Sequence, residues 1–315
     1  MSPGKLSNER AVELWYGARR LSFDDSSTPK TDPPSGAGKP GIGMKVAIQG
    51  EPGSFSHEAA KKLNAEAQIV PFSLSADVFS ALTRGAVDAA VIPIENSLAG
   101  SVLEHFDLLL AQDVRVDQET LLRIQHNLIA LAGTTIRDID RVFSHPVALA
   151  QCRRFLAAHP KMESFAYYDT AGSVKQLVEL RDRHAAAIAS EGAAHYYGAS
   201  ILQSNIEDNP ENFTRFFLVR RKNDSVADPQ ANKISIAFSV ENRPGSLVTA
   251  LSELSRVGTN LTKIESRPVH GKPWEYIFYV DCQIQSPDEG SRALAALQPH
   301  CAMVKELGRY QEAKH

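Results

Sequence analysis

The stretch AAVIPIENSLAGSVLEHFDLLLA, residues 89–111, contains one complete unit of the fold. Residues 89–94 form a short apolar run, which predicts a buried strand. The polar triplet 95–97 ends this run, and apolar side chains then recur at helical spacing. Ser101 and Glu104 match a capping box, so we expect the helix to begin there. The stretch therefore predicts a strand, a polar turn and a helix in that order.

The same unit recurs four more times along the chain. Apolar runs at 46–48, 142–143, 165–168 and 186–189 each precede small polar residues and a helical pattern. This alternation predicts an α/β fold with a largely parallel sheet. In such sheets ligands bind outside the carboxyl ends of the strands, which is where these polar residues gather.

The chain divides where turn-forming residues gather. Residues 1–43 end in a segment rich in proline and glycine and are expected to form a disordered tail. The polar residues 222–231 are predicted to link a large α/β body at 44–221 to a small domain at 232–315. The small domain has the order strand, helix, strand, strand, helix, strand, which is the ferredoxin-like βαββαβ unit of an α+β fold. Gly258 is expected to end its first helix.

The composition excludes several classes of function. The formal net charge is −3 and no long basic run occurs, so we expect neither a nucleic-acid surface nor a membrane surface. The apolar runs are too short to cross a bilayer. The 3 cysteines form no CxxC motif, and the histidines have no metalloprotease spacing, so we expect no disulfide and no bound metal. These features predict a cytoplasmic protein.

The stretch NPENFTRFFLV, residues 209–219, carries the most specific chemistry. It places Thr214 and Arg215, a hydroxyl and a permanent cation, directly before a buried apolar run. Arginine binds carboxylates with a planar fork. Glu95 follows another predicted strand, where a carboxyl group can be partly desolvated. These residues predict a pocket for a small anion without metal or cofactor, and they leave open whether the protein is an enzyme or a binding module.

Other polar residues can contribute to the same pocket. The loop 50–56 contains glycines and leads into a helix, so it is either a cradle for a carboxylate or a tight turn. It lacks the spacing of a nucleotide-binding loop. Ser144 and Gln151 offer neutral hydrogen bonds, although a helix cap and a surface helix would also explain them.

Several motifs together resemble the prephenate dehydratase family. The motifs are GEPGSFSHEAA, IPIENSLAGSV, SHPVALAQC, DTAGSVK and IEDNPENFTRFFLV, and PGSLVTALSEL and NLTKIESRP resemble an ACT regulatory domain. The likeness covers about residues 44–310. It implies a catalytic region of two α/β lobes, like periplasmic binding proteins, with the active site in the cleft between them. It also implies a lyase that converts prephenate to phenylpyruvate in phenylalanine biosynthesis, without a cofactor.

The resemblance implies roles for particular residues. Thr214 is the threonine that contacts the departing hydroxyl group, Glu95 is the candidate supporting acid and Arg215 the candidate clamp for a substrate carboxylate. A free aliphatic hydroxyl is a weak acid, so its proton has to be relayed or its donor role preorganised. The residues expected to bind and orient the substrate are Asn96, Ser97, Ser144, Gln151, Thr170, Ala171 and Phe216.

The ACT resemblance implies allosteric control by L-phenylalanine at the interface of paired domains, hence a homodimer or homotetramer. The expected effector residues are Gly245, Ser246, Leu247, Asn260, Leu261, Glu265, Ser266, Arg267 and Pro268. Ser246 stands where the family motif usually has alanine. Two other functions stay open: an arogenate dehydratase, which acts on the amino-acid analogue of prephenate, and a catalytically silent amino-acid sensor.

Overall fold

The computed structural model describes residues 43–225, 228–269 and 274–314. The predicted amino-terminal tail lies outside these residues except for Gly43. Within these ranges no helix combines the length and apolar composition needed to span a membrane. The same described residues contain no group of three or more His, Cys, Asp or Glu side chains arranged to hold a metal ion.

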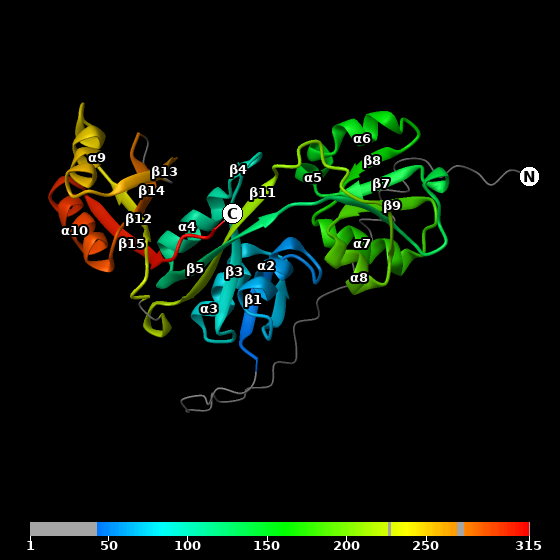
Figure 1. The fold of residues 1–315 in the computed structure, drawn as a ribbon, viewed down its shortest axis with the longest axis horizontal. Coiled ribbons are helices and arrows are strands. Elements are labelled where there is room, and N and C mark those ends of the chain that lie inside the picture. Colours follow the sequence, from blue (N-terminus) through cyan, green and yellow to red (C-terminus); the bar gives the residue numbers. More distant parts are fainter. Residues whose placement is uncertain (1–42, 226–227, 270–273, 315) are drawn as a thin grey trace, which may run out of the picture. The chain divides into compact units, whose positions relative to one another are not determined.

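The first lobe is built on the parallel strands β2, β1 and β3, with β1 in the centre (Figure 1). Val46 and Ile48 pack with helix α2 on one face of this sheet, while Ala47 packs with α3 on the other. The alternation follows from the two-residue period of a strand. The bounds are β1 (Lys45–Gln49), α2 (Phe55–Leu63), β2 (Gln68–Phe72), α3 (Ser75–Thr83), β3 (Ala89–Asn96), β4 (Gly100–Ser101) and α4 (Leu103–Ala111).

Two long strands connect this lobe to the second. β5 (Val114–Arg123) leads the chain out of the first lobe, and β11 (Phe213–Arg221) brings it back. β11 runs antiparallel to both β3 and β5. The expected largely parallel sheet is therefore only partly correct, because β11 enters the sheet from the opposite direction.

The second lobe contains a five-stranded sheet in the order β10-β6-β9-β7-β8. β8, β7 and β9 run parallel to one another, whereas β6 runs antiparallel to β9 and β10 runs antiparallel to β6. Its bounds are β6 (Asn127–Ala130), η1 (Ile136–Asp138), β7 (Arg141–Ser144), α5 (Pro146–Gln151), α6 (Arg153–Ala158), β8 (Glu163–Ala166), α7 (Thr170–Leu180), β9 (Ala185–Ala189), α8 (Glu191–Tyr197) and β10 (Ser200–Gln203).

The small domain has the predicted βαββαβ order, and the predicted fold class of a two-lobed α/β region plus an α+β domain is confirmed. A short η2 (Lys222–Asp224) precedes it, and Gly258 has a φ of 93° directly after the cap of its first helix, as expected for a C′ residue. The bounds are β12 (Lys233–Ser239), α9 (Ser246–Arg256), β13 (Asn260–Pro268), β14 (Tyr276–Gln283), α10 (Pro287–Leu297), η3 (Gln298–His300) and β15 (Met303–Tyr310).

One contact joins the sheets of the small domain and the first lobe. β15 pairs with β5 at Gly308 and Val116, which produces a continuous sheet of ten strands. A Cβ on Gly308 would lie 2.2 Å from the carbonyl oxygen of Val116, so the backbones approach this closely only because residue 308 is glycine. The sequence pattern did not predict this junction.

Candidate active site

A cavity of about 480 Å³ lies between the two lobes. The first lobe lines it with the loop after β1, the end of β3, the segment around β4 and the start of β11. The second lobe lines it with the amino-terminal ends of α5 and α7 and with His126, which precedes β6. The cavity therefore lies at the polar strand ends that the sequence analysis identified.

Thr214 points into this cavity from β11. Its hydroxyl oxygen accepts a hydrogen bond of 2.9 Å from Nδ2 of Asn96, at the end of the neighbouring strand β3. Because an amide N–H can only donate, the hydroxyl proton of Thr214 does not point at Asn96. That proton is available for a molecule in the cavity.

A network of side chains fixes the orientation of the Asn96 amide. Nδ2 of Asn96 also donates to Oδ1 of the buried Asn212, and its Oδ1 accepts the backbone N–H groups of Leu98 and Ala99. Gln151 continues the network by donating to Oδ1 of Asn96 at 3.4 Å. With these partners, the hydrogen bonds of the Asn96 amide are all satisfied in one orientation, in which its nitrogen faces Thr214.

Behind Gln151 lies His126. Oε1 of Gln151 accepts hydrogen bonds of 2.9 Å from both Asn212 and Nε2 of His126. Nε2 therefore carries the proton of the imidazole. Burial lowers the pKa of His126, which favours this neutral form.

The amino-terminal ends of four helices face the cavity. The lining includes the N-cap residues of α2, α4, α5 and α7, which are Ser54, Val102, His145 and Asp169. A helix amino terminus carries a partial positive charge. In α2, α5 and α7 the N-cap side chain already accepts one backbone N–H, whereas α4 has no side-chain cap. Among the described residues that line the cavity there is no lysine or arginine. An anion in this cavity would be held by helix ends and neutral donors.

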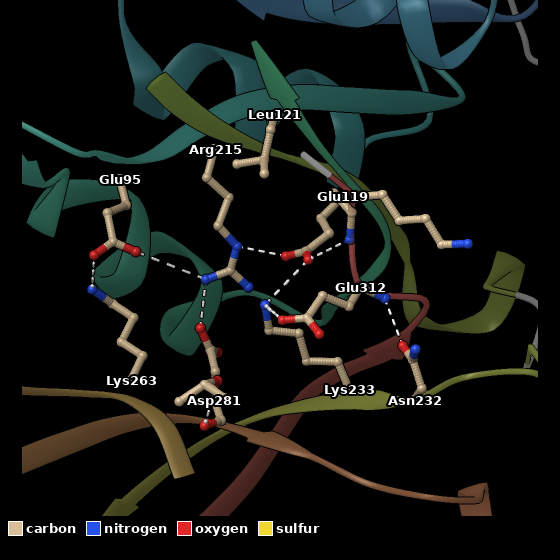
Figure 2. Close-up of a pocket in the computed structure, with 12 residues that line it drawn as sticks. Glu95, Glu119, Leu121, Arg215, Asn232, Lys233, Lys263, Asp281 and Glu312 are labelled. Atoms are coloured by element: carbon tan, nitrogen blue, oxygen red, sulfur yellow. Dashed lines mark hydrogen bonds and ion pairs between the residues drawn. The ribbon is translucent and has the colours of Figure 1, made fainter. Parts of the chain in front are cut away.

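Arg215 points to the opposite face of β11 and lines a second cavity of about 620 Å³ (Figure 2). Its guanidinium donates to Glu119 on β5, to Asp281 on β14 and, at 2.8 Å, to the hydroxyl of Tyr310 on β15. Burial opposes the charge, but Tyr310 and the two carboxylates hold the pKa of Arg215 above its usual range.

Thr214 and Arg215 were expected to act in one pocket, but the two side chains line different cavities, because both residues lie within a strand and adjacent strand residues face opposite sides. The hydrogen bonds of the Arg215 guanidinium join the first lobe to the small domain. The predicted clamp on a substrate carboxylate does not fit this position.

Glu95 also lies on the face away from Thr214. Its carboxylate binds Nζ of Lys263 on β13 at 2.8 Å and lies 3.9 Å from the Arg215 guanidinium. Glu95 lines the second cavity and is absent from the described lining of the first. The geometry therefore gives Glu95 a partner in the small domain instead of a place beside Thr214.

Glu95→Gln should leave kcat within about fivefold of wild type, because partly exposed ion pairs contribute only about 0.2–1 kcal/mol. If Glu95 were the supporting acid, the same change would lower kcat by about 10²-fold or more. Steady-state kinetics of this variant would separate the two roles. Gln49→Glu, which adds a carboxylate on the side of the first cavity, provides the reverse change for comparison.

The other predicted substrate contacts divide into two groups. Asn96, Gln151, Thr170 and Phe216 line the first cavity. Three residues do not, namely Ser97, Ser144 and Ala171. The hydroxyl of Ser144 is fully buried and donates to the carbonyl of Ile188 at 2.6 Å, so its proton already has a partner. Ser97 exchanges hydrogen bonds with the backbone of 211–213, and Ala171 is fully buried in α7.

The predicted capping box at Ser101 and Glu104 is absent. Helix α4 has Val102 at its N-cap and no side-chain cap. The hydroxyl of Ser101 instead donates to Glu265 at 2.7 Å and accepts from Lys263 at 2.8 Å, both on β13. Ser101 also lines the first cavity, so one residue contacts both that cavity and the small domain.

The predicted effector residues lie at two places in the small domain. Gly245 adopts a φ of 83° before α9, where Ser246 and Leu247 begin the helix. The others belong to β13, which is an edge strand. Within one chain, Glu265 and Arg267 bind Ser101 and Asp107 of the first lobe, while Asn260, Leu261, Ser266 and Pro268 are exposed. Glu265, one of the expected effector residues, here binds a residue of the first lobe.

Asp169 and His126 are among the residues of the first cavity to which the sequence analysis assigned no role. Asp169 stands at a strand end next to Thr170, and this position was the available signal. His126 had no motif around it, and only the contact with Gln151, 25 residues away, gives it a place in the site.

Comparisons with known proteins match two domain families to the chain. The family model described as prephenate dehydratase matches residues 46–224, and the ACT domain model matches residues 234–297. The chain is 39% identical to arogenate dehydratase/prephenate dehydratase 2, chloroplastic, of Arabidopsis thaliana, with 86% of this chain and 73% of the relative covered.

Two solved structures are also similar. Prephenate dehydratase from Arthrobacter aurescens in complex with L-Phe shares 30% identity and a TM-score of 0.79, covering 85% of this chain and 90% of that one. GqqA, described as a novel type of quorum quenching acylase, shares 31% identity and a TM-score of 0.77, covering 85% and 97%. The catalytic-region match and the identity over most of the chain show that this protein belongs to the prephenate dehydratase family and carries an ACT domain.

Proposed function

We propose that the protein converts prephenate to phenylpyruvate by eliminating the ring hydroxyl group and carbon dioxide. The observation that carries this proposal is the Thr214 hydroxyl, which Asn96 orients toward a cavity faced by four helix amino termini. Family membership supports the reaction type, and the cavity supports an anionic substrate.

The cavity suits the charge distribution of this reaction. Prephenate carries two carboxylates, one of which leaves as carbon dioxide. A full cation bound to that carboxylate would stabilise the substrate more than the transition state and would slow its loss. Helix ends supply partial charges that bind the anion with a weaker preference for its ground state. The Thr214 hydroxyl then donates to the departing oxygen as negative charge develops there.

The test is turnover of the purified protein on prephenate and, separately, on L-arogenate, each with and without L-phenylalanine. We expect phenylpyruvate to form from prephenate and L-phenylalanine to lower the rate. Higher kcat/KM on arogenate would instead assign to the protein the arogenate dehydratase activity for which the Arabidopsis relative is also named. Binding of L-phenylalanine without turnover of either substrate would favour the silent sensor.

The control by L-phenylalanine is part of the same proposal. The ACT domain and the similarity to a family member solved with L-Phe support it. We further propose a dimer or tetramer formed through ACT domains and a cytoplasmic location. The exposed edge strand β13, with Leu261 and Ile264 exposed, is available for pairing. Coupling between two binding sites is reciprocal. Substrate should therefore weaken L-phenylalanine binding by the same factor by which L-phenylalanine weakens substrate binding.

A further inference from the structure

Asp169 is an acidic residue of the first cavity that the mechanism above does not use. Its Oδ1 accepts the backbone N–H of Gly172 at 2.7 Å and caps helix α7. Its Oδ2 faces the first lobe and lies so close to Gly50 that a Cβ added to this glycine would be 2.7 Å from the oxygen. The carboxyl group therefore lies between the second lobe, which carries it, and the loop after β1.

The charges around Asp169 do not favour its ionised form. Glu51 of the same loop is the nearest acid, and it is bound by Tyr168 and Lys175. Tyr197 on α8 faces the same group, and His126 and His145 line the cavity. Within the described ranges Asp169 has no ion pair with a lysine or arginine. Burial, with a contribution from the Glu51 carboxylate, raises the pKa of Asp169 to about 6 against the opposing effect of the backbone N–H groups of Gly172, Glu51 and Ala171.

Substrate binding should shift this balance further. A substrate with two carboxylates adds negative charge beside a carboxyl group that has no cation, and like charges disfavour ionisation. Asp169 then holds a proton in the complex, at the wall of the cavity into which Thr214 donates. Because a threonine hydroxyl is a far weaker acid than a carboxyl group, Asp169 is the better proton source of the two.

We propose that Asp169 is the general acid that protonates the departing hydroxyl group. This inference rests on the proposed function. As the ring C–O bond breaks, its electron pair goes to oxygen, which takes the proton of Asp169 and leaves as water. The bond to the lost carboxylate breaks at the same time, its electrons complete the aromatic ring, and carbon dioxide forms. Asp169 is left ionised and takes up a proton from solvent after product release.

The test compares the pH dependence of kcat in wild type and in Asp169→Asn. Asparagine caps helices as well as aspartate, so α7 keeps its cap while the proton is lost. We expect wild-type kcat to fall above the pKa of Asp169 in the complex. At pH 6 we expect the kcat of D169N to be lower than that of wild type by about 10²-fold or more, and we expect its kcat to show no fall with rising pH. D138N, which changes a carboxylate that caps η1 outside the cavity, is the matched control and should behave as wild type.

Two results would overturn the inference. One is a D169N enzyme with wild-type kcat and pH profile, which would leave Asp169 as a helix cap only. The other comes from calorimetry of the wild-type protein with phenylpyruvate in buffers of different ionisation enthalpy near pH 7, which does not depend on any variant folding. We expect net proton uptake on binding, and an uptake near zero would contradict the proposal. A wild-type protein inactive on prephenate and arogenate would instead refute the proposed function.

Discussion

Thr214→Val should lower kcat for prephenate by about 10²–10⁴-fold and leave KM within a few-fold. Valine has nearly the shape of threonine, so the cavity wall between Asn96 and Phe216 keeps its form. The hydroxyl that donates to the departing oxygen is lost, and Nδ2 of Asn96 keeps a second acceptor in Asn212. The loss should therefore appear in the chemical step, because the helix ends that hold the substrate are unchanged. Initial rates of phenylpyruvate formation measure both constants.

Thr214→Ser is the matched control for this prediction. Serine keeps the hydroxyl and its bond to Asn96, so most of kcat should return. A Val variant with full turnover, or a Ser variant as inactive as the Val variant, would contradict the role of the hydroxyl. A large rise in KM with kcat unchanged would make Thr214 a residue for binding only.

Arg215→Met should reduce the free energy of unfolding by about 3–5 kcal/mol, because it leaves buried carboxylates without their cation. Glu119 would retain Lys233, but among the described residues the Asp281 carboxylate would retain only the hydroxyl of Ser235. Both carboxylates are almost fully buried and cannot recover their hydration while the domains stay joined. Urea denaturation followed by circular dichroism gives the change in stability.

Lys222→Met provides a comparison for Arg215. Lys222 forms an exposed pair with Asp113 at 3.8 Å, and its loss should cost about 0–1 kcal/mol. If Arg215→Met kept wild-type stability but lost turnover, the guanidinium would act in the reaction and the structural role would be wrong.

The local architecture was predictable because each strand and helix carries its own signal. The apolar run 89–94 and the helical spacing after it specify β3 and α4 without distant contacts. The positions of Asn96 and Thr170 follow from the rule that polar strand ends meet at one edge of a sheet, whereas Gln151 and Phe216 were implied by the family resemblance. The error over Arg215 came from reading the strand as starting at Phe216. With the strand beginning at Phe213, alternation assigns Thr214 and Arg215 to opposite faces.

The contacts between distant parts of the chain were not predictable in this way. Glu95 and Lys263 are 168 residues apart, and the sequence around either residue does not predict their contact. Ser101 and Glu104 satisfied the spacing of a capping box, but the Ser101 hydroxyl instead donates to Glu265 and accepts from Lys263. Asp169 was visible only as a polar residue at a strand end. Its lack of a cation is a property of the folded surroundings.

A structure of the protein with bound phenylpyruvate would test the central claim most directly, because the two faces of β11 line different cavities. The claim predicts the product between the lobes, with its carboxylate at the helix amino termini and its ring near Thr214 and Phe216. Product bound instead in the second cavity, with its carboxylate on the Arg215 guanidinium, would contradict the account and restore the arginine clamp.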